Sequence, residues 1–446
     1  MTTPTRRRHK KRRSPRSPNK TQTPQSQQTV QIAKLGRQGE GIAATKPDIS
    51  AQHVFVPFAL PGEQVKILSD GKRGDLLEII VPSPNRIQPI CPYFTRCGGC
   101  SMQHLENKSY QAWKLNTLRT ALKHQGINST SESKLENLPE IDFIDAHGNG
   151  RRRVTLHIRF TKGRILAGFM QAKSRELIDI DSCPILAPRL KNTPDIARGL
   201  AAPFASSKQK LDIQFTATPE GLDCDIQGAG NVSPETHVML SKCVQKHQLA
   251  RLTIDGETAL QRCKPMITMG AALVPLPPSS FLQATDLGEN TLADLVLKGV
   301  GKAKKVADLF CGIGPFALRL STRSQVYAAD SNTAMINALK MAARFAKGLK
   351  PINANVRDLF RDPVYQDDLN AFDAIVINPA RAGAHSQIQE IAASTVANVV
   401  YVSCDPTSLA RDALILIQSG YQITQITAVD QFKYANHIET VTVFKR

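Results

Sequence analysis

The sequence has no long apolar run. Hydrophobic residues make up 41% of its 446 positions, yet no stretch approaches the roughly 18–20 consecutive apolar residues that a membrane-spanning helix needs. No apolar segment follows the basic start of the chain, so a secretory signal is not expected. These absences exclude a transmembrane protein and predict a cytoplasmic location.

Acidic residues are scarce, above all near the start. The chain carries 57 Lys and Arg against 38 Asp and Glu, a formal net charge of +19. Nine of these cations and no acid lie within residues 1–28, which leaves +10 for the rest. Because this stretch is otherwise Thr, Pro, Ser and Gln, we expect a disordered basic arm that tethers RNA and carries no chemistry. The charge favours nucleic acid over a membrane surface as the partner.

The nine cysteines are scattered and odd in number, so a disulfide framework is not expected. Cys91, Cys97 and Cys100 lie within CPYFTRCGGC, where two glycines let the backbone fold tightly enough for three thiols to face one point. Cys183, in the turn-like DSCP, supplies a fourth thiol. Four thiolates suit an iron–sulfur cluster or zinc, and the grouping of three plus one favours a cluster over zinc and over unligated core cysteines.

The length predicts several domains, because one hydrophobic core stops growing at roughly 250–300 residues. Residues 29–86 alternate like short strands with glycines at the turns, which predicts a small β-barrel of a kind that often binds RNA. Residues 87–278 combine the helical segment SYQAWKLNTLRTALKHQG with short strand-like runs, which predicts an α+β central domain. Its Arg151, Arg152 and Arg153 fit a strand's rim and an RNA contact equally well.

Strands alternate with helices over residues 279–446, which predicts a doubly wound, mostly parallel α/β sheet with its ligand at the carboxyl ends of the strands. The turn DLFCGIG has two glycines where a dinucleotide fold uses three. Asp330 ends the next strand, where a carboxylate can accept hydrogen bonds from ribose hydroxyls. A shortened glycine loop with no pyrophosphate to hold favours an S-adenosylmethionine site over a nicotinamide site.

Two residues indicate a reaction. Cys404 follows the apolar run NVVYV at a strand's carboxyl end, and Glu439, near His437, begins the last strand. Methylation of pyrimidine carbon 5 needs such a pair, because a thiolate first adds to ring carbon 6 and a base later removes the proton from carbon 5. The competing interpretation of Cys404 is a small buried hydrophobic residue. The Asp-Pro turn after it and the nearby acid favour the nucleophile.

These motifs, in this order, resemble those of the bacterial RNA uracil-5-methyltransferases, specifically the 23S ribosomal RNA branch with an N-terminal TRAM barrel and a 4Fe-4S cluster. The resemblance covers residues 29–446 and rests on GRQGEGIA, VFVPFALPGEQV, CPYFTRCGGCSMQH, SSFLQAT, DLFCGIGPFAL, NPARAG, SCDPTSLARD and HIETV. It implies methylation of a specific uridine that is flipped out of its stack. It also implies a 4Fe-4S cluster rather than zinc.

The resemblance gives each motif a role. It implies that Cys404 is the nucleophile and Glu439 the proton acceptor. The residues implied to contact S-adenosylmethionine are Gln283, Phe310, Asp330, Asp358 and Asn378, and those implied to hold the cluster are Cys91, Cys97, Cys100 and Cys183. The related tRNA enzyme is similar only in its catalytic part, so barrel and cluster together imply 23S rRNA as the partner, and we expect a monomer.

The chain departs from the family pattern beside the cofactor. Asn378-Pro379-Ala380-Arg381 stands where the family has Asp-Pro-(Pro/Ala)-Arg. Because an amide keeps one acceptor and gains donors, we expect weakened or retuned activity rather than loss. The alternatives are a tRNA uridine-5-methyltransferase and a non-catalytic rRNA-binding assembly factor. An iron–sulfur radical methylase is disfavoured because the CxxxCxxC triad is absent.

Overall fold

The structure, a computed structural model, describes residues 26–44, 53–127, 138–161, 163–172, 174–206 and 209–446. The chain divides into two compact units, one reaching to Ser83 without Arg37–Gly39, the other comprising Arg37–Gly39 and Pro84–Arg446. Most of the expected basic arm lies outside the described residues. Its last three residues, 26–28, belong to strand β1 and so are not disordered. No helix in the described ranges combines the length and apolar character needed to cross a bilayer.

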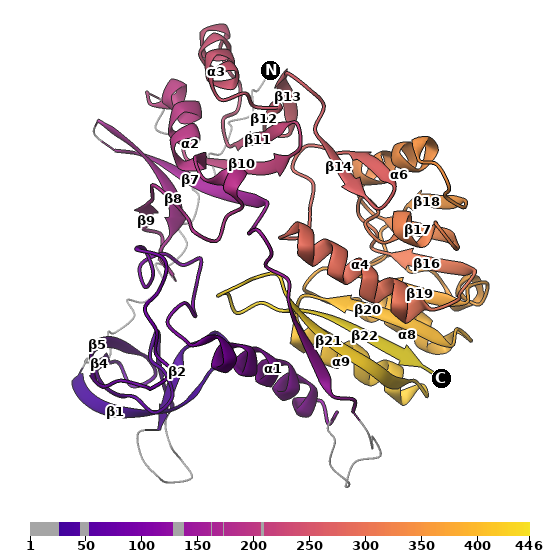
Figure 1. The fold of residues 1–446 in the computed structure, drawn as a ribbon, viewed down its shortest axis with the longest axis horizontal. Helices are drawn as coiled ribbons and strands as arrows, with labels where there is room; N and C mark the ends of the chain where they lie inside the picture. The colour runs from indigo at the N-terminus through magenta and orange to yellow at the C-terminus, as the bar shows by residue number, and fades with distance from the viewer. Residues whose placement is uncertain (1–25, 45–52, 128–137, 162, 173, 207–208) are drawn as a thin grey trace, which may run out of the picture. The chain divides into compact units, whose positions relative to one another are not determined.

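The first unit is a five-stranded antiparallel sheet of order β3-β2-β1-β4-β5 (Figure 1). Its strands are β1 (Ser26–Leu35), β2 (Gly41–Ala44), β3 (His53–Val56), β4 (Gln64–Ser69) and β5 (Gly74–Val81). The backbone N–H of Phe55 in β3 donates to the carbonyl of Lys72, just before β5, at 3.0 Å. The two edges therefore approach each other, and the sheet curls around a small apolar core in the range predicted to form a barrel.

The middle of the second unit contains a seven-stranded sheet of order β13-β12-β11-β10-β7-β8-β9. Its strands are β7 (Arg153–Thr161), β8 (Arg164–Met170), β9 (Leu177–Asp179), β10 (Leu211–Thr218), β11 (Gly221–Gln227), β12 (Arg251–Ile254) and β13 (Glu257–Gln261). Helices α2 (Thr193–Ala201) and α3 (Pro234–Lys246) share its core, and the 3-10 turns are η1 (Pro188–Leu190) and η2 (Ala202–Phe204). This α+β arrangement follows the prediction for the central region.

The last part of the second unit is built on an eight-stranded sheet of order β18-β17-β16-β19-β20-β22-β21-β6 (Figure 1). In chain order its strands are β6 (Ile141–Asp145), β16 (Lys305–Leu309), β17 (Gln325–Asp330), β18 (Ile352–Val356), β19 (Ala374–Ile377), β20 (Asn398–Ser403), β21 (Gln422–Asp430) and β22 (Glu439–Lys445). The strands from β18 to β20 are parallel, and β22 runs antiparallel to both neighbours. The doubly wound prediction is therefore correct, with one reversed strand.

Helices cover both faces of this sheet, which explains why its central strands read as unbroken apolar runs. One face packs on α4 (Asp286–Val300), α5 (Ala317–Leu320), α6 (Thr333–Phe345) and the hairpin β14 (Met266–Met269)–β15 (Ala272–Pro275). The other packs on α1 (Asn107–His124), α7 (Gln366–Leu369), α8 (His385–Ala393) and α9 (Pro406–Gln418). Neighbouring residues of one strand serve opposite faces, as Val306 and Ala307 do in β16.

Two elements of this layer come from the range 87–278, which the sequence analysis assigned to the central domain. β6 extends the sheet by pairing in parallel with β21, and α1 packs against α9. The sequence of α1 and of β6 shows that both elements must be buried, but it does not show which sheet buries them. The predicted domain boundary at residue 279 therefore leaves out two elements that belong to the last sheet and its helix layer.

Candidate active site

The strand order reverses at β16, which pairs with β17 on one side and β19 on the other. The crossover connections leave the sheet in opposite directions here, and sheets of this type bind ligands beyond the carboxyl ends of the strands at such a point. The segments that leave this edge carry the candidate cofactor residues Phe310, Asp330, Asp358 and Asn378.

The loop after β16 is tightly folded. Phe310 begins it with φ of +61°, an unusual value for a residue with a side chain, and its ring centroid lies 5.1 Å from that of Phe360. Gly314 has φ of +89°, and a Cβ atom there would lie 2.4 Å from a methyl carbon of Leu339 in α6. The loop therefore needs glycine at this position, as DLFCGIG indicated, and its backbone lies directly on the helix.

Asp330, at the end of β17, holds this loop in place. Its Oδ2 accepts a hydrogen bond from the N–H of Gly312 at 2.9 Å, and its Oδ1 accepts from the N–H of Asn332 at 2.9 Å. A carboxylate keeps further lone pairs, so Asp330 can fix the loop and still accept from a ribose hydroxyl. Asp358 lies two residues beyond β18, with its side chain 44% exposed.

A second carboxyl lies beneath the loop. Asp308, in the middle of β16, is fully buried, and burial together with nearby Asp330 raises its pKa to about 8. Its neutral form therefore predominates near pH 7. The sequence analysis gave this residue no role, because an aspartate inside DLF cannot be told from a strand-end acid without knowing its burial.

Asn378 follows β19, and its backbone N–H donates to the carbonyl of Leu309 at 3.1 Å. Its side chain makes no hydrogen bond with any described residue. The loop that begins at Asn378 ends at Ala384, and Asp412 in α9 fixes that end. Oδ2 of Asp412 accepts hydrogen bonds from the N–H of Ala384 at 2.8 Å and from the hydroxyl of Tyr401 at 2.7 Å. The conformation of this loop thus does not depend on a carboxylate at position 378.

Cys404 and Glu439 lie opposite each other on neighbouring antiparallel strands. β20 ends at Ser403, which pairs with Thr440, so the next residues on the two strands, Cys404 and Glu439, face each other. Burial and the charge of Glu439 raise the pKa of Cys404 to about 11. The structure therefore brings together the two residues that the sequence analysis proposed as nucleophile and base, at the edge that carries the glycine loop.

Burial controls the protonation of this pair. It raises the pKa of Glu439 to about 7, although a hydrogen bond from Gln431 and the charge of Arg381 oppose the shift. Burial and then Arg381 lower the pKa of His437 to about 4, and its Nε2 lies 3.1 Å from a guanidinium nitrogen of Arg381. Near neutral pH the site holds a protonated thiol, a neutral imidazole and a carboxyl close to its midpoint.

A buried glutamine that the sequence analysis missed connects the two halves of the site. The side-chain nitrogen of Gln431 donates to Oε1 of Gln283 at 2.6 Å and to Oε1 of Glu439 at 3.2 Å. Its own Oε1 accepts from the N–H of Ala284 at 2.7 Å. Gln283, predicted to meet the cofactor, and Glu439, predicted to be the base, are thus bonded through one side chain.

The segment between β21 and β22, residues 431–438, is anchored by helix α1. Lys114 forms a buried ion pair with Asp430 at 2.5 Å and also donates to the carbonyl of His437 at 2.7 Å. The hydroxyl of Tyr110 donates to Asp430 at 2.7 Å and accepts from the N–H of Tyr434 at 2.9 Å. No motif could have revealed these supports, because their two sides lie more than three hundred positions apart in the sequence.

The cysteine segment contacts the same 431–438 segment. The backbone N–H groups of Ser101 and Met102 donate to the carbonyl of Tyr434 at 2.8 and 3.1 Å. The glycines of the cysteine motif allow a close approach to β8, since a Cβ on Gly98 would lie 2.9 Å from the carbonyl of Met170. The residues that follow Cys100 therefore help to position the segment that leads to Glu439.

The four candidate ligand thiols influence one another. Burial, and to a smaller extent the other thiols, raise the pKa of Cys183 to about 12 and that of Cys100 to about 11. Among the described residues, no three Cys, His, Asp or Glu side chains are arranged to hold a single metal ion. Four thiolates are the ligand set of structural zinc sites and of iron–sulfur clusters.

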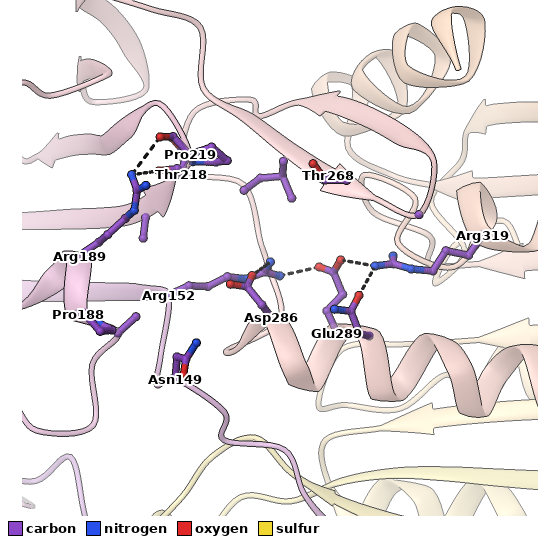
Figure 2. Close-up of a pocket in the computed structure, with 15 residues that line it drawn as sticks. Asn149, Arg152, Pro188, Arg189, Thr218, Pro219, Thr268, Asp286, Glu289 and Arg319 are labelled. Carbon is purple, nitrogen blue, oxygen red and sulfur yellow. Dashed lines mark hydrogen bonds and ion pairs between the residues drawn. The ribbon is translucent and has the colours of Figure 1, made fainter. Parts of the chain in front are cut away.

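A pocket of about 730 Å³ lies between the seven-stranded sheet and helices α4 and α5 (Figure 2). Arg152 spans its floor, donating to Asp286 at 2.7 Å and to buried Glu289 at 2.6 Å, and Arg319 reaches Glu289 from α5 at 3.2 Å. The Nε of Arg152 also donates to the carbonyl of Gln283 at 3.0 Å. Arg152 is therefore a buried structural arginine, which decides between the two interpretations of that residue.

The comparisons with known proteins agree with this architecture. A solved structure of the Pyrococcus abyssi tRNA (uracil-54, C5)-methyltransferase, in complex with S-adenosyl-L-homocysteine, matches with a TM-score of 0.69 at 20% identity. The match covers 93% of this chain and 99% of that one, so the fold is that of an α/β methyltransferase with additional domains. It also corrects one expectation: a tRNA enzyme can share nearly the whole architecture, so the architecture alone does not imply rRNA.

Sequence comparison identifies the family. The model of the tRNA (Uracil-5-)-methyltransferase family matches residues 280–446. An uncharacterized RNA methyltransferase of Caulobacter vibrioides is 41% identical over 420 residues, 92% of this chain and 98% of the relative. The 23S rRNA (uracil(1939)-C(5))-methyltransferase RlmD of Vibrio vulnificus is 28% identical over 429 residues, 93% of this chain and 95% of the relative. The chain belongs to the RNA uracil-5-methyltransferase family.

Proposed function

We propose that the protein transfers a methyl group from S-adenosylmethionine to carbon 5 of a uridine in 23S rRNA, with Cys404 as nucleophile and Glu439 as base. The observation that carries the proposal is the register of β20 and β22, which sets this thiol opposite this carboxyl at the edge of the sheet that carries the glycine loop. Uracil chemistry needs a nucleophile and a base on one ring, and the pair supplies both.

The cofactor would lie against the carboxyl ends of β16 to β19. The acceptor oxygens of Asp330 suit ribose hydroxyls, and the paired rings of Phe310 and Phe360 offer an apolar surface for a purine. Asp358 is exposed enough to accept from an exocyclic amine, and the unpaired side chain of Asn378 can face either cofactor or uridine. When bound, S-adenosylmethionine supplies an electrophilic methyl group on a sulfonium.

Cys404 must lose its proton before or as it adds to carbon 6 of the ring. Its pKa of about 11 means that the free enzyme holds a thiol at neutral pH. Glu439 faces it with a pKa of about 7, so its carboxylate can pass the thiol proton on to solvent and be charged again before the later step. Arg381 favours the thiolate, and expulsion of water by a flipped uridine strengthens that attraction.

Addition of the thiolate makes carbon 5 of the uridine nucleophilic, so that carbon 5 takes the methyl group and S-adenosylhomocysteine leaves. Glu439 then takes the proton from carbon 5, which restores the ring double bond and expels the thiolate of Cys404. A general base works best with a pKa near the working pH, and burial gives Glu439 such a value. Its Oε1 is occupied by Gln431, while no described group bonds Oε2. The second oxygen is therefore the one that can reach the substrate proton.

The choice of 23S rRNA over tRNA rests on the Vibrio vulnificus relative, which matches nearly the whole chain. The net charge of +19 suits any large RNA and does not discriminate. A tRNA substrate is the second candidate, because the Pyrococcus abyssi tRNA enzyme shares the fold over 93% of this chain.

The test is methyl incorporation from labelled S-adenosylmethionine into 23S rRNA and into tRNA purified from a strain lacking the gene. We expect 5-methyluridine at one position of 23S rRNA, located by mass mapping of nuclease fragments. Incorporation only into tRNA would replace the substrate and keep the chemistry. No incorporation into either RNA would overturn the enzyme and support an RNA-binding assembly factor.

We further propose that Cys91, Cys97, Cys100 and Cys183 hold a 4Fe-4S cluster, in line with the electrostatic influence of the first three thiols on Cys183 and with the resemblance of the CPYFTRCGGC motif. Its role would be structural, since four thiolates leave no iron open. Iron and sulfide content and visible absorption of anaerobically purified protein provide the test. Cys183→Ser should lose the cluster, whereas Cys243→Ser, on α3, should keep it. Stoichiometric zinc in place of iron would contradict the proposal.

A further inference from the structure

Gln431 uses its amide oxygen and its amide nitrogen in hydrogen bonds to three different residues. It is fully buried at the end of β21, and its three hydrogen bonds reach Gln283, Glu439 and the backbone of Ala284. Gly288, in the first turn of α4, leaves it room, since a Cβ atom there would lie 2.8 Å from both Cβ and Oε1 of Gln431. The side chain is therefore held by packing as well as by its bonds.

The neighbours of Gln431 dictate how its amide is oriented. The N–H of Ala284 can only donate, so it must meet the oxygen of Gln431. Both hydrogens of the Gln431 amide then point at acceptors, one at Gln283 and one at Glu439. The opposite orientation would set an oxygen against a carboxylate and an NH₂ group against an N–H. One backbone bond thus fixes the direction of the whole chain of amides.

The orientation of the Gln431 amide also fixes the orientation of the Gln283 amide. Its Oε1 is used by Gln431, and its amide nitrogen has no partner among the described residues. A ligand that approaches the amide nitrogen of Gln283 therefore meets hydrogen-bond donors. The group recognised there is an acceptor, such as a carboxylate of the cofactor or a carbonyl oxygen of the base.

We propose that Gln431 is a positioning residue that holds the oxygen of Gln283, turns its amide donors toward the ligand and leaves Glu439 one free oxygen, so that ligand recognition and proton removal are set together. The inference rests on the proposed function of Glu439 and adds a residue that no motif marked. It predicts that loss of the Gln431 amide changes ligand affinity and the pH dependence of turnover in the same variant.

The expected pH effect follows from the groups that face Glu439. These are Gln431 from β21, Cys404 from the end of β20 and Arg381 from the loop after β19. Gln431 and Arg381 favour the carboxylate, whereas burial favours the neutral acid. Removal of the Gln431 donor therefore raises the pKa of Glu439 further above its usual range, and more alkali is needed to form the base.

The experiment compares Gln431→Met, which keeps length and apolar volume, with Gln387→Met as the matched control. Gln387, on α8, is also fully buried, but among the described residues its amide bonds only to the backbone of Val364 and to neither Gln283 nor Glu439. Both variants should lose similar stability. Only Gln431→Met should move the acidic limb of the kcat profile alkaline, by roughly one pH unit, the scale of one hydrogen bond.

Calorimetric titration with S-adenosylhomocysteine and steady-state kinetics for RNA give the second readout. Gln431→Met should weaken the binding of S-adenosylhomocysteine, or raise KM for RNA, by about 3- to 10-fold, the scale of one misdirected hydrogen bond. In a protein that already carries Gln283→Met, the added Gln431→Met substitution should have little further effect on affinity or KM, since the two residues act on one contact.

The outcomes separate the two proposals. If Glu439→Gln methylates RNA at the native rate, Glu439 is not the base and the proposed chemistry fails whatever Gln431 does. If Glu439→Gln is inactive but Gln431→Met keeps the native pH profile and affinities, the positioning role of Gln431 is wrong and its contribution is stability alone. A shifted profile with native Gln387→Met behaviour supports the role.

Discussion

The proposed cofactor side of the site and the proposed catalytic side, each named by those roles below, are built in different ways. On the cofactor side, Asp330 ends a strand, and Phe310, Asp358 and Asn378 each lie one or two residues beyond the end of a strand. Short contacts hold them, such as the bond from the N–H of Gly312 to Asp330. On the catalytic side, Glu439 depends on side chains that arrive from distant parts of the chain. The first arrangement needs the sheet alone, whereas the second needs most of the second unit to be folded.

The difference also appears in the electrostatics. The exposed acid of the cofactor side, Asp358, is open to solvent, and a nucleotide can replace water around it. Cys404, Glu439 and His437 are desolvated, and burial is the main cause of every pKa shift among them. We infer that affinity for the cofactor is a local property, while turnover reports the integrity of the distant supports. The predictions below test that division.

Removal of the nucleophile should give the largest effect. Cys404→Ser should lower methylation by at least ~10³-fold, because a hydroxyl is a far weaker nucleophile than a thiolate, while binding of S-adenosylhomocysteine stays within about twofold. Cys243→Ser, a substitution of a half-buried cysteine on α3, should be silent in both assays. Native turnover by Cys404→Ser would contradict the covalent mechanism, and with it the distinction between a cofactor side and a catalytic side.

Loss of Lys114, the residue of α1 that anchors the 431–438 segment, should lower both the stability of the protein and its turnover. Lys114→Met leaves Asp430 buried without its cation, at a cost of about 3–5 kcal/mol in the free energy of unfolding, and should lower kcat because the 431–438 segment loses a support. Arg251→Met breaks a comparably buried ion pair with Asp223 in the seven-stranded sheet. Denaturant unfolding should show similar losses, with kcat lowered only in Lys114→Met.

A substitution on the cofactor side should give the opposite pattern. Asp330→Asn should weaken cofactor binding by about 10-fold, since a charged acceptor of both the loop and a ribose hydroxyl becomes a neutral one. At saturating cofactor its kcat should remain close to native. Calorimetry and kinetics at high cofactor concentration check this, and a fall in kcat without a loss of affinity would contradict a local cofactor side.

The smallest effect concerns stability and pH. The pKa of Asp308 in the folded protein, about 8, lies above its ordinary value, so the folded state binds this proton more tightly than the unfolded state. The resulting stabilisation is greatest at low pH and is lost as the pH rises through about 8. Asp308→Asn removes this dependence, so between pH 6 and 9 the native Tm should fall more steeply, by roughly 2–4 °C. Parallel curves would show that Asp308 is ionised in the folded state.

The same division explains how much could be predicted from the sequence. The doubly wound sheet, the turn at Gly314 and the pairing of Cys404 with Glu439 follow from local patterns, because strand ends and glycine turns are encoded where they occur. Gln431, Lys114 and Asp308 escaped, because their roles depend on burial and on partners from remote segments. The sheet assignment of β6 escaped for the same reason.

The recruitment of β6 into the last sheet has a consequence for synthesis of the chain. Ile141 pairs beside Ile426, so this strand must wait for a partner that is synthesised 285 residues later. At 5–20 residues per second the interval is roughly 15–60 s. During this time β6 and the apolar face of α1 lack their final neighbours, β21 and α9. The nascent protein thus carries an unfinished edge that is a natural place for a chaperone to act, and a fragment begun at residue 279 would lack that edge strand altogether.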